Sequence, residues 1–105
     1  MIEAGRYKLS ILPLFEEDLN EIVDYIALQL ENPIAAQALA DDVERALIER
    51  TACAESFEPY HSKFQRELPY YRIYVRNYVI YYVVKGDTME VRRILYKRRD
   101  RENII

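Results

Sequence analysis

The sequence predicts a small α+β domain in which a helical hairpin packs on one face of a small, mainly antiparallel sheet. Two observations predict this class: helical apolar stripes in the first half of the chain, and three strand-like segments in its last third. A length of 105 residues is close to the commonest size of one domain. We therefore expect residues 1–105 to form a single domain.

The first half predicts a strand followed by two helices. Residues 7–12 alternate as a strand does, and Pro13 suits the first turn of a helix whose apolar stripe continues to about Leu30. Asn32 and Pro33 suit the N-cap and the first position of a second helix. Because the link is so short, the helices should form an antiparallel hairpin. The second stripe consists of Ala36, Leu39, Ala40, Val43, Ala46 and Leu47, extended by Ala54.

The last third predicts three antiparallel strands. Residues 71–75, 78–84 and 89–96 are rich in Tyr, Val and Ile, and their links are short enough for hairpin turns, whereas residues 56–69 have no period and predict a loop. The element order is then β-α-α-β-β-β. The unbroken apolar run from Val79 to Val84 is typical of a central strand covered on both faces. Since the hairpin covers one face only, we expect the C-terminal tail or a partner protein to cover the other.

Charge is divided unevenly along the chain. Residues 1–60 contain 13 acidic and 4 basic residues, whereas residues 61–105 contain 5 acidic and 11 basic residues. We therefore expect an acidic face and a basic face, the second suited to a polyanion or an acidic protein. No apolar segment reaches the ~18–20 residues of a membrane span, and the single Cys53 cannot form an internal disulfide. These features predict a cytoplasmic protein with no membrane, metal or cofactor partner.

Three segments resemble the toxins of bacterial type II toxin–antitoxin modules, the RelE/ParE superfamily. The helix opening Pro13-x-Phe15-x-x-Asp18-Leu19-x-x-Ile22-x-x-Tyr25-Ile26 looks like the family's first helix. Residues 72–83, RIYVRNYVIYYV, are similar to its central strands, and residues 91–100, VRRILYKRRD, to its last strand and basic exit. Taken together, the segments extend the resemblance over essentially the whole chain. It implies a toxin that a cognate antitoxin holds inactive.

The resemblance implies one of two activities. ParE-like members block DNA gyrase, whereas RelE-like members cut messenger RNA within the ribosome. Arg72 and Arg99 match positions of RelE-type catalytic groups, and Glu58 has the spacing of a general base in a sister branch. Val79, however, stands where the ribonucleases have an Arg, and the loss of such a donor typically costs ~10²–10³ in rate. We therefore favour the ParE-like branch. If the chain is instead an enzyme, the resemblance implies metal-independent RNA cleavage.

The candidate residues for binding a target or an antitoxin lie in the last third of the chain. They are Tyr74, Arg76, Tyr78, Tyr81, Tyr96, Lys97, Arg98 and Arg99. Each has a structural alternative: tyrosines pack sheet faces, Arg72 and Arg76 can pair with acidic residues such as Glu90, and a terminal run of charges is often solvated surface.

Three hypotheses therefore remain. The chain is a toxin that inhibits DNA gyrase by binding, a ribosome-dependent endoribonuclease, or a non-toxic binding module. The expected partners are a cognate antitoxin and either DNA gyrase or the ribosome with its message. A homodimer and a toxin–antitoxin hetero-oligomer are both compatible with the sequence.

Overall fold

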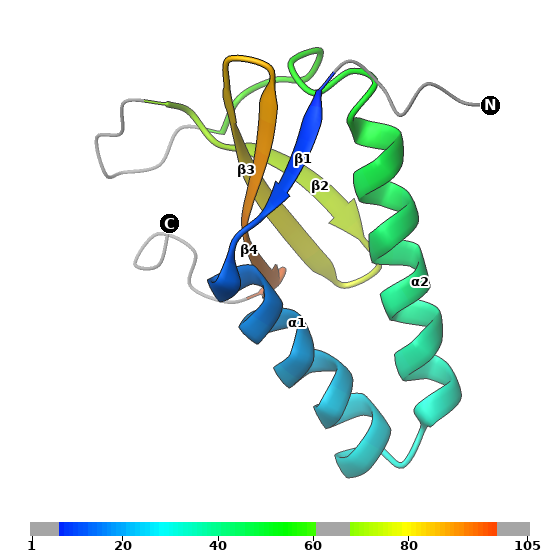
Figure 1. The fold of residues 1–105 in the computed structure, drawn as a ribbon. Helices are drawn as coiled ribbons and strands as arrows, with labels where there is room; N and C mark the ends of the chain where they lie inside the picture. The colour runs from blue at the N-terminus through cyan, green and yellow to red at the C-terminus, as the bar shows by residue number, and fades with distance from the viewer. Residues whose placement is uncertain (1–6, 61–67, 99–105) are drawn as a thin grey trace, which may run out of the picture.

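Helices and strands follow one another in the predicted order in a computed structural model, which describes residues 7–60 and 68–98 (Figure 1). The elements are β1 (Lys8–Ile11), α1 (Pro13–Asp24), the π-helix η1 (Tyr25–Gln29), α2 (Pro33–Arg50), β2 (Tyr71–Val75), β3 (Tyr78–Lys85) and β4 (Thr88–Tyr96). The α+β class is thereby confirmed. Within the described ranges, no helix is long and apolar enough to cross a membrane.

The four strands form one sheet in the order β1-β4-β3-β2. β1 runs parallel to β4, with Ile11 opposite Val91, and the other neighbours are antiparallel. β3 is therefore an inner strand, as its apolar run predicts. All six residues from Val79 to Val84 are buried, since side chains pack against both faces of the strand.

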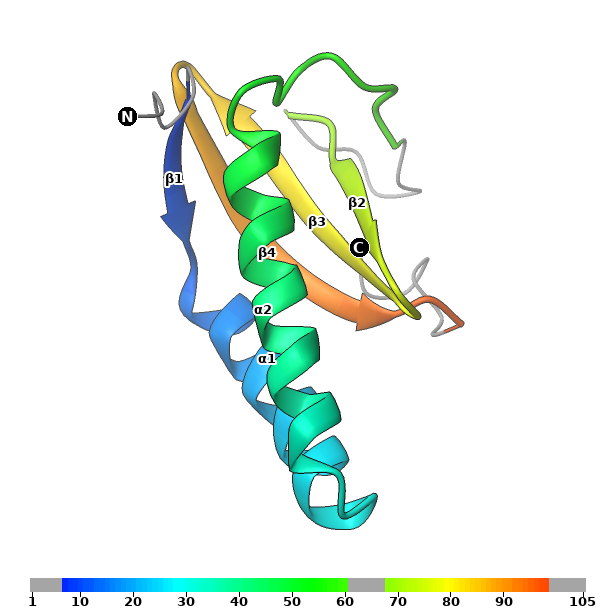
Figure 2. The same cartoon turned by 90° about the vertical axis from the view of Figure 1, so that its right-hand side faces the viewer.

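The helical hairpin covers one face of the sheet (Figures 1 and 2). Phe15 of α1 and the predicted stripe of α2 enter this core, where Leu39, Val43 and Leu47 are buried. Opposite them, the sheet contributes Ile80, Tyr82, Val91 and Ile94, among others. The core thus lies between the hairpin and the sheet.

The first helix differs from the prediction near its end. Its last turn widens into the π-helix η1, where the Leu30 amide donates to the carbonyl of Tyr25, five residues back, over 3.1 Å. Because a π-turn has more residues than an α-turn, it rotates the following side chains off the α-helical stripe. Leu30, expected on the buried stripe, is consequently exposed.

A β-bulge in β4 explains how two consecutive arginines leave the core. Tyr81 pairs with Arg93 and Tyr82 with Val91, so Arg92 is the extra residue. The bulge lets Val91 and Ile94 both face the hairpin. Arg93 turns towards α1 and donates to Asp18 over 2.7 and 2.9 Å. Asp18 also accepts the backbone amide of Ile94 over 3.1 Å, beyond the point where β1 stops pairing with β4, and so anchors α1 to the sheet.

Candidate functional site

The second face of the sheet, turned away from the helices, is covered by the chain itself. Tyr60 and Leu68, from the described ends of the loop before β2, pack with the buried Tyr70 on Val79, Tyr81, Val83 and Leu95. Tyr60 and Tyr70 also form an isolated β-bridge. The sequence predicted the C-terminal tail or a partner on this face, whereas the loop before β2 contributes Tyr60 and Leu68 to it. Residues 99–105 of the tail lie outside the described residues.

The aromatic side chains of this face hold Tyr81 inside it. The Tyr81 ring centroid is 5.9 Å from that of Tyr60 and 6.0 Å from that of Tyr70, the second in an edge-on arrangement. Tyr81 is fully buried. In this conformation it therefore presents no surface to a target or an antitoxin, and its contribution is to the packing of the second face.

Arg72 and Tyr74 mark the open edge of the same face. The guanidinium carbon of Arg72 lies 4.8 Å from the ring centroid of Tyr60 and 5.9 Å from that of Tyr74. Tyr74 is exposed on the edge strand β2. These two predicted residues therefore do lie together, and Tyr74 is accessible to a partner.

Arg76 occupies the turn between β2 and β3 and is tied to the hairpin. It has a left-handed φ of 55°, and its Nε donates to Asp42 of α2 over 2.8 Å. Arg45 and Arg76 together lower the pKa of Asp42. The predicted pairing with an acidic residue is thus realised with Asp42 instead of Glu90.

Glu90 is itself engaged elsewhere. Its carboxylate accepts from Arg92 over 2.8 Å and lies 3.5 Å from Lys85. Burial alone would raise the pKa of Glu90, but Arg92 and Lys85 outweigh burial and lower it. Glu90, the acidic residue predicted to pair with Arg72 or Arg76, is therefore neutralised by residues of β3 and β4.

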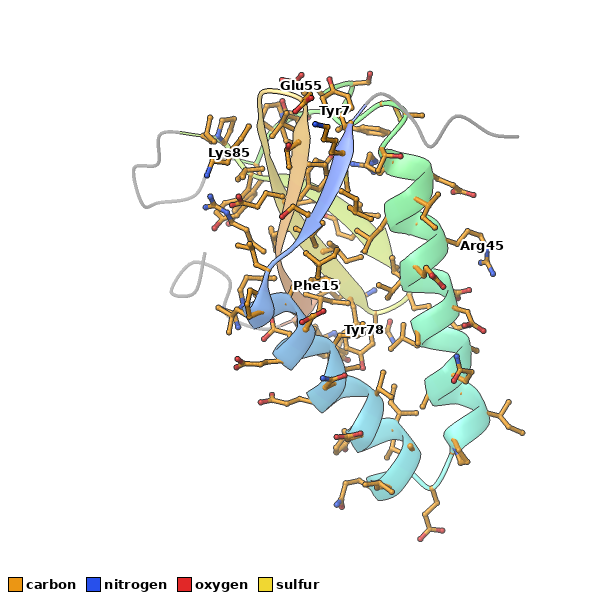
Figure 3. All side chains as sticks on the ribbon, in the orientation of Figure 1. Tyr7, Phe15, Arg45, Glu55, Tyr78 and Lys85 are labelled. Atoms are coloured by element: carbon orange, nitrogen blue, oxygen red, sulfur yellow. The ribbon has the colours of Figure 1, made fainter. Side chains whose placement is uncertain are left out.

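Tyr78 and Tyr96 lie on the helix side of the sheet. They are paired across β3 and β4 with ring centroids 5.7 Å apart, and Tyr78 packs against the main core. Figure 3 shows Tyr78 between the hairpin and the ends of the strands. Burial, and then the neighbouring Tyr96 and Tyr25, raise the pKa of Tyr78. The tyrosines that we had grouped as one binding set are thus divided between the two faces.

Basic residues gather where β4 ends. The Lys97 amide donates to the carbonyl of Asn77 over 2.8 Å, which fixes the exit from β4 beside the β2–β3 turn. Lys97 and Arg98 are exposed and form no salt bridge within the described part of the chain. We call Arg76, Tyr78, Tyr96, Lys97 and Arg98 the basic end of the sheet.

A groove of ≈ 270 Å³ opens between the hairpin and the β2–β3 turn. Its wall on the hairpin side is mostly apolar, from Ile26, Leu30, Ala35 and Leu39 with Asn32 among them, and its wall on the turn side is polar, from Arg76 and Asn77. Tyr78 belongs to both the groove and the basic end. An apolar groove beside exposed cations suits a segment that combines apolar and acidic side chains.

Comparison with known proteins identifies the family. The family model described as the ParE toxin of the type II toxin–antitoxin system, parDE, matches residues 9–101. The chain belongs to the ParE toxin family. A solved structure described as the chromosomal ParDE toxin–antitoxin system from P. aeruginosa has the same fold, with a TM-score of 0.69 and 18% sequence identity over 87% of this chain and 96% of the other. Among curated proteins no match is found.

Two of the three predicted ribonuclease groups, Glu58 and Arg72, lie within the described residues of the ParE-family toxin. Glu58 is exposed in the loop after α2 and forms no salt bridge there, while Arg72 stacks on tyrosines. Arg99 lies outside the described residues. Val79 is fully buried opposite Tyr74 and Leu95, so no charged group reaches the surface from that position. No group of three His, Cys, Asp or Glu residues suited to a metal ion occurs in the described part of the toxin.

Sequence reasoning missed the contribution of Arg50. Its Nη1 donates to the carbonyl of Arg72 over 3.1 Å and to the Tyr82 hydroxyl over 2.9 Å, and its guanidinium lies 3.6 Å from the Phe57 ring centroid. Tyr82 in turn donates to the carbonyl of Ala54 over 2.6 Å. Arg50 therefore joins the end of α2 to the edge strand of the toxin. Its position in the last turn of the helix was the available signal, since a cation there can reach nearby carbonyls.

Proposed function

We propose that this ParE-family toxin inhibits growth by binding DNA gyrase, and that a cognate antitoxin neutralises it. The observation that carries the proposal is the position of Val79. A ribonuclease of this superfamily needs donors aimed at the phosphate during cleavage. Here Val79 contributes a buried isopropyl group to a packed face and cannot donate a hydrogen bond, which favours inhibition by binding over RNA cleavage.

We place the antitoxin at the basic end of the sheet. Lys97 and Arg98 supply cations that no acidic residue of the described chain neutralises, and the neighbouring groove supplies an apolar surface. A segment with acidic and apolar side chains would bury its apolar groups in the groove and pair its carboxylates with the two cations. Tyr96, exposed beside them, adds an aromatic contact surface.

The target is tested by inducing the toxin in bacterial cells. Plasmid topology and the 5′ ends of transcripts are measured in the same cultures. We expect plasmids to lose negative supercoils, or to accumulate breaks, while translated messages stay intact. New cuts within translated messages, with normal plasmid topology, would instead establish the ribosome-dependent ribonuclease.

The antitoxin site is tested with two charge reversals of equal size. Arg98→Glu changes the basic end, whereas Lys8→Glu changes an exposed lysine of β1 whose partner Asp87 is also exposed. We expect Arg98→Glu to weaken antitoxin binding about tenfold or more, as loss of an interfacial charge pair does, and Lys8→Glu to leave it unchanged. Equal affinities for the two variants would contradict this placement.

A further inference from the structure

The helical hairpin projects beyond the sheet as an arm. Its tip, formed by η1 and the start of α2, lies well past the ends of the strands (Figure 2). Four large apolar side chains of this tip, Tyr25, Leu28, Leu30 and Ile34, are between 55% and 81% exposed. Exposed apolar patches mark interaction sites with other proteins or membranes, and these four side chains all lie at the turn of the hairpin.

The turn at the tip is closed by hydrogen bonds. The Asn32 amide donates to the carbonyl of Ile26 over 3.0 Å, and the Asn32 side chain caps α2 by accepting the Ala35 amide over 3.1 Å. Glu31 takes a left-handed φ of 52° between them. A fixed turn displays its apolar side chains in one geometry, so a partner loses less conformational entropy when it binds.

The arm is also strongly acidic. From Leu9 to Glu44 the chain has no Lys, Arg or His and nine acidic residues. Two of these are neutralised, Asp18 by Arg93 and Asp42 by Arg45 and Arg76. The other seven are exposed and form no salt bridge within the described chain: Glu16, Glu17, Glu21, Asp24, Glu31, Asp41 and Glu44.

The exposed apolar tip and the acidic arm together indicate which kind of partner can bind there. A nucleic acid or an anionic membrane would be repelled, and two arms meeting tip to tip would bring like charges together. Contacts between the acidic arm of one copy and the basic end of another would join two different surfaces, and such contacts can extend into open chains of molecules without forming a closed oligomer. A basic protein surface with an apolar depression satisfies both the carboxylates and the apolar tip.

We propose that the tip of the arm docks on the basic, nucleic-acid-binding surface of the protein that the toxin inhibits. This inference rests on the proposed function, in which the target is an enzyme that handles DNA. Such an enzyme presents clustered Lys and Arg to the phosphates, which is the surface that an acidic arm complements. The toxin then has an acidic arm for its target and a basic end for its antitoxin, and Leu30 belongs both to the tip of the arm and to the groove beside the basic end.

The test compares two double variants. Leu28→Ser with Ile34→Ser removes exposed apolar side chains from the tip, and Leu14→Ser with Ile48→Ser removes exposed ones from the base of the arm. All four side chains are exposed, so both variants should retain the wild-type melting temperature. Should the tip double variant fail to fold, Ile34→Ser alone replaces it, since Ile34 is the most exposed of the four tip side chains.

Growth arrest on induction, affinity for purified DNA gyrase and affinity for the antitoxin are measured for each variant. We expect the tip variant to lose growth arrest and at least about tenfold in gyrase affinity, while it keeps antitoxin binding and the base variant keeps all three. Binding of the wild type to gyrase should weaken with added salt and with competing DNA. Growth arrest that survives in the tip variant would overturn the inference, even if its oligomeric state or antitoxin binding changed.

The readouts separate this inference from the proposed function. The wild type could arrest growth without affecting gyrase, while the tip variant loses that arrest. This result would reject gyrase as the target and support docking through the arm. If the wild type inhibits gyrase and the tip variant does so equally well, the proposed function stands and docking through the arm is rejected. A wild type that arrests no growth would reject both.

Discussion

Replacement of Asp18 by alanine should destabilise the protein severely, because this carboxylate joins α1 to the sheet. The Asp18 and Arg93 side chains are only 12% and 19% exposed, and the carboxylate accepts three hydrogen bonds, two from Arg93 and one from the Ile94 amide. Exposed ion pairs contribute about 1 kcal/mol or less. Removing one partner of a buried pair costs about 3–5 kcal/mol, because it leaves the other charge unpaired.

Because this pair is only partly buried, the expected cost of Asp18→Ala is near the lower end of the buried range, at about 3 kcal/mol. For a domain of this size the melting temperature should fall by at least about 10 °C. Urea unfolding measures the free energy, and an unchanged slope would show that the native and unfolded states keep their compactness.

The matched control is Glu17→Ala, one residue away on the same helix, where the side chain is exposed and forms no salt bridge within the described chain. It should change the free energy of unfolding by no more than about 0.5 kcal/mol. If Asp18→Ala cost less than about 1 kcal/mol, or no more than the control, the reasoning that this partly buried carboxylate anchors the arm would be refuted.

Two further predictions concern polar groups near the core. Tyr82→Phe removes the hydroxyl that donates to Ala54 and accepts from Arg50, so the free energy of unfolding should fall by about 1–3 kcal/mol, measured by urea unfolding; a change within the error of the measurement would contradict it. Glu90 has a folded-state pKa below its ordinary value of 4.5, so its stabilising contribution is present above that pH and is lost as the pH falls through the folded-state pKa. Thermal melts across the acid range should therefore show that Glu90→Gln loses less stability than the wild type as the pH falls, and parallel losses would contradict this.

Much of the fold could be predicted because it depends on local patterns. The helical stripe of α2 identified Leu39, Val43 and Leu47 as core residues, and the apolar run of β3 identified an inner strand. The missed features depend on contacts that no local pattern encodes. The π-turn exposed Leu30, and the Asp18–Arg93 pair joins residues 75 positions apart.

The candidate site was predicted less well than the fold, for a related reason. The loop before β2 has no period, so nothing indicated that Tyr60 would bury Tyr81. The grouping of tyrosines assumed one accessible face, whereas Tyr78 points into the core beneath the hairpin. The exposure of Lys97 and Arg98 could be predicted from the sequence, since charged side chains just after a strand are solvated without any tertiary contact.

We propose that this toxin acts by binding its target and not by cutting messenger RNA. The most direct test is a titration of purified toxin against purified DNA gyrase in a supercoiling assay, with a translating extract as the parallel reaction. We predict inhibition that saturates near equimolar toxin, is reversed by the antitoxin, and is accompanied by intact messages in the extract. Unaffected supercoiling together with cleavage of translated messages would contradict the account.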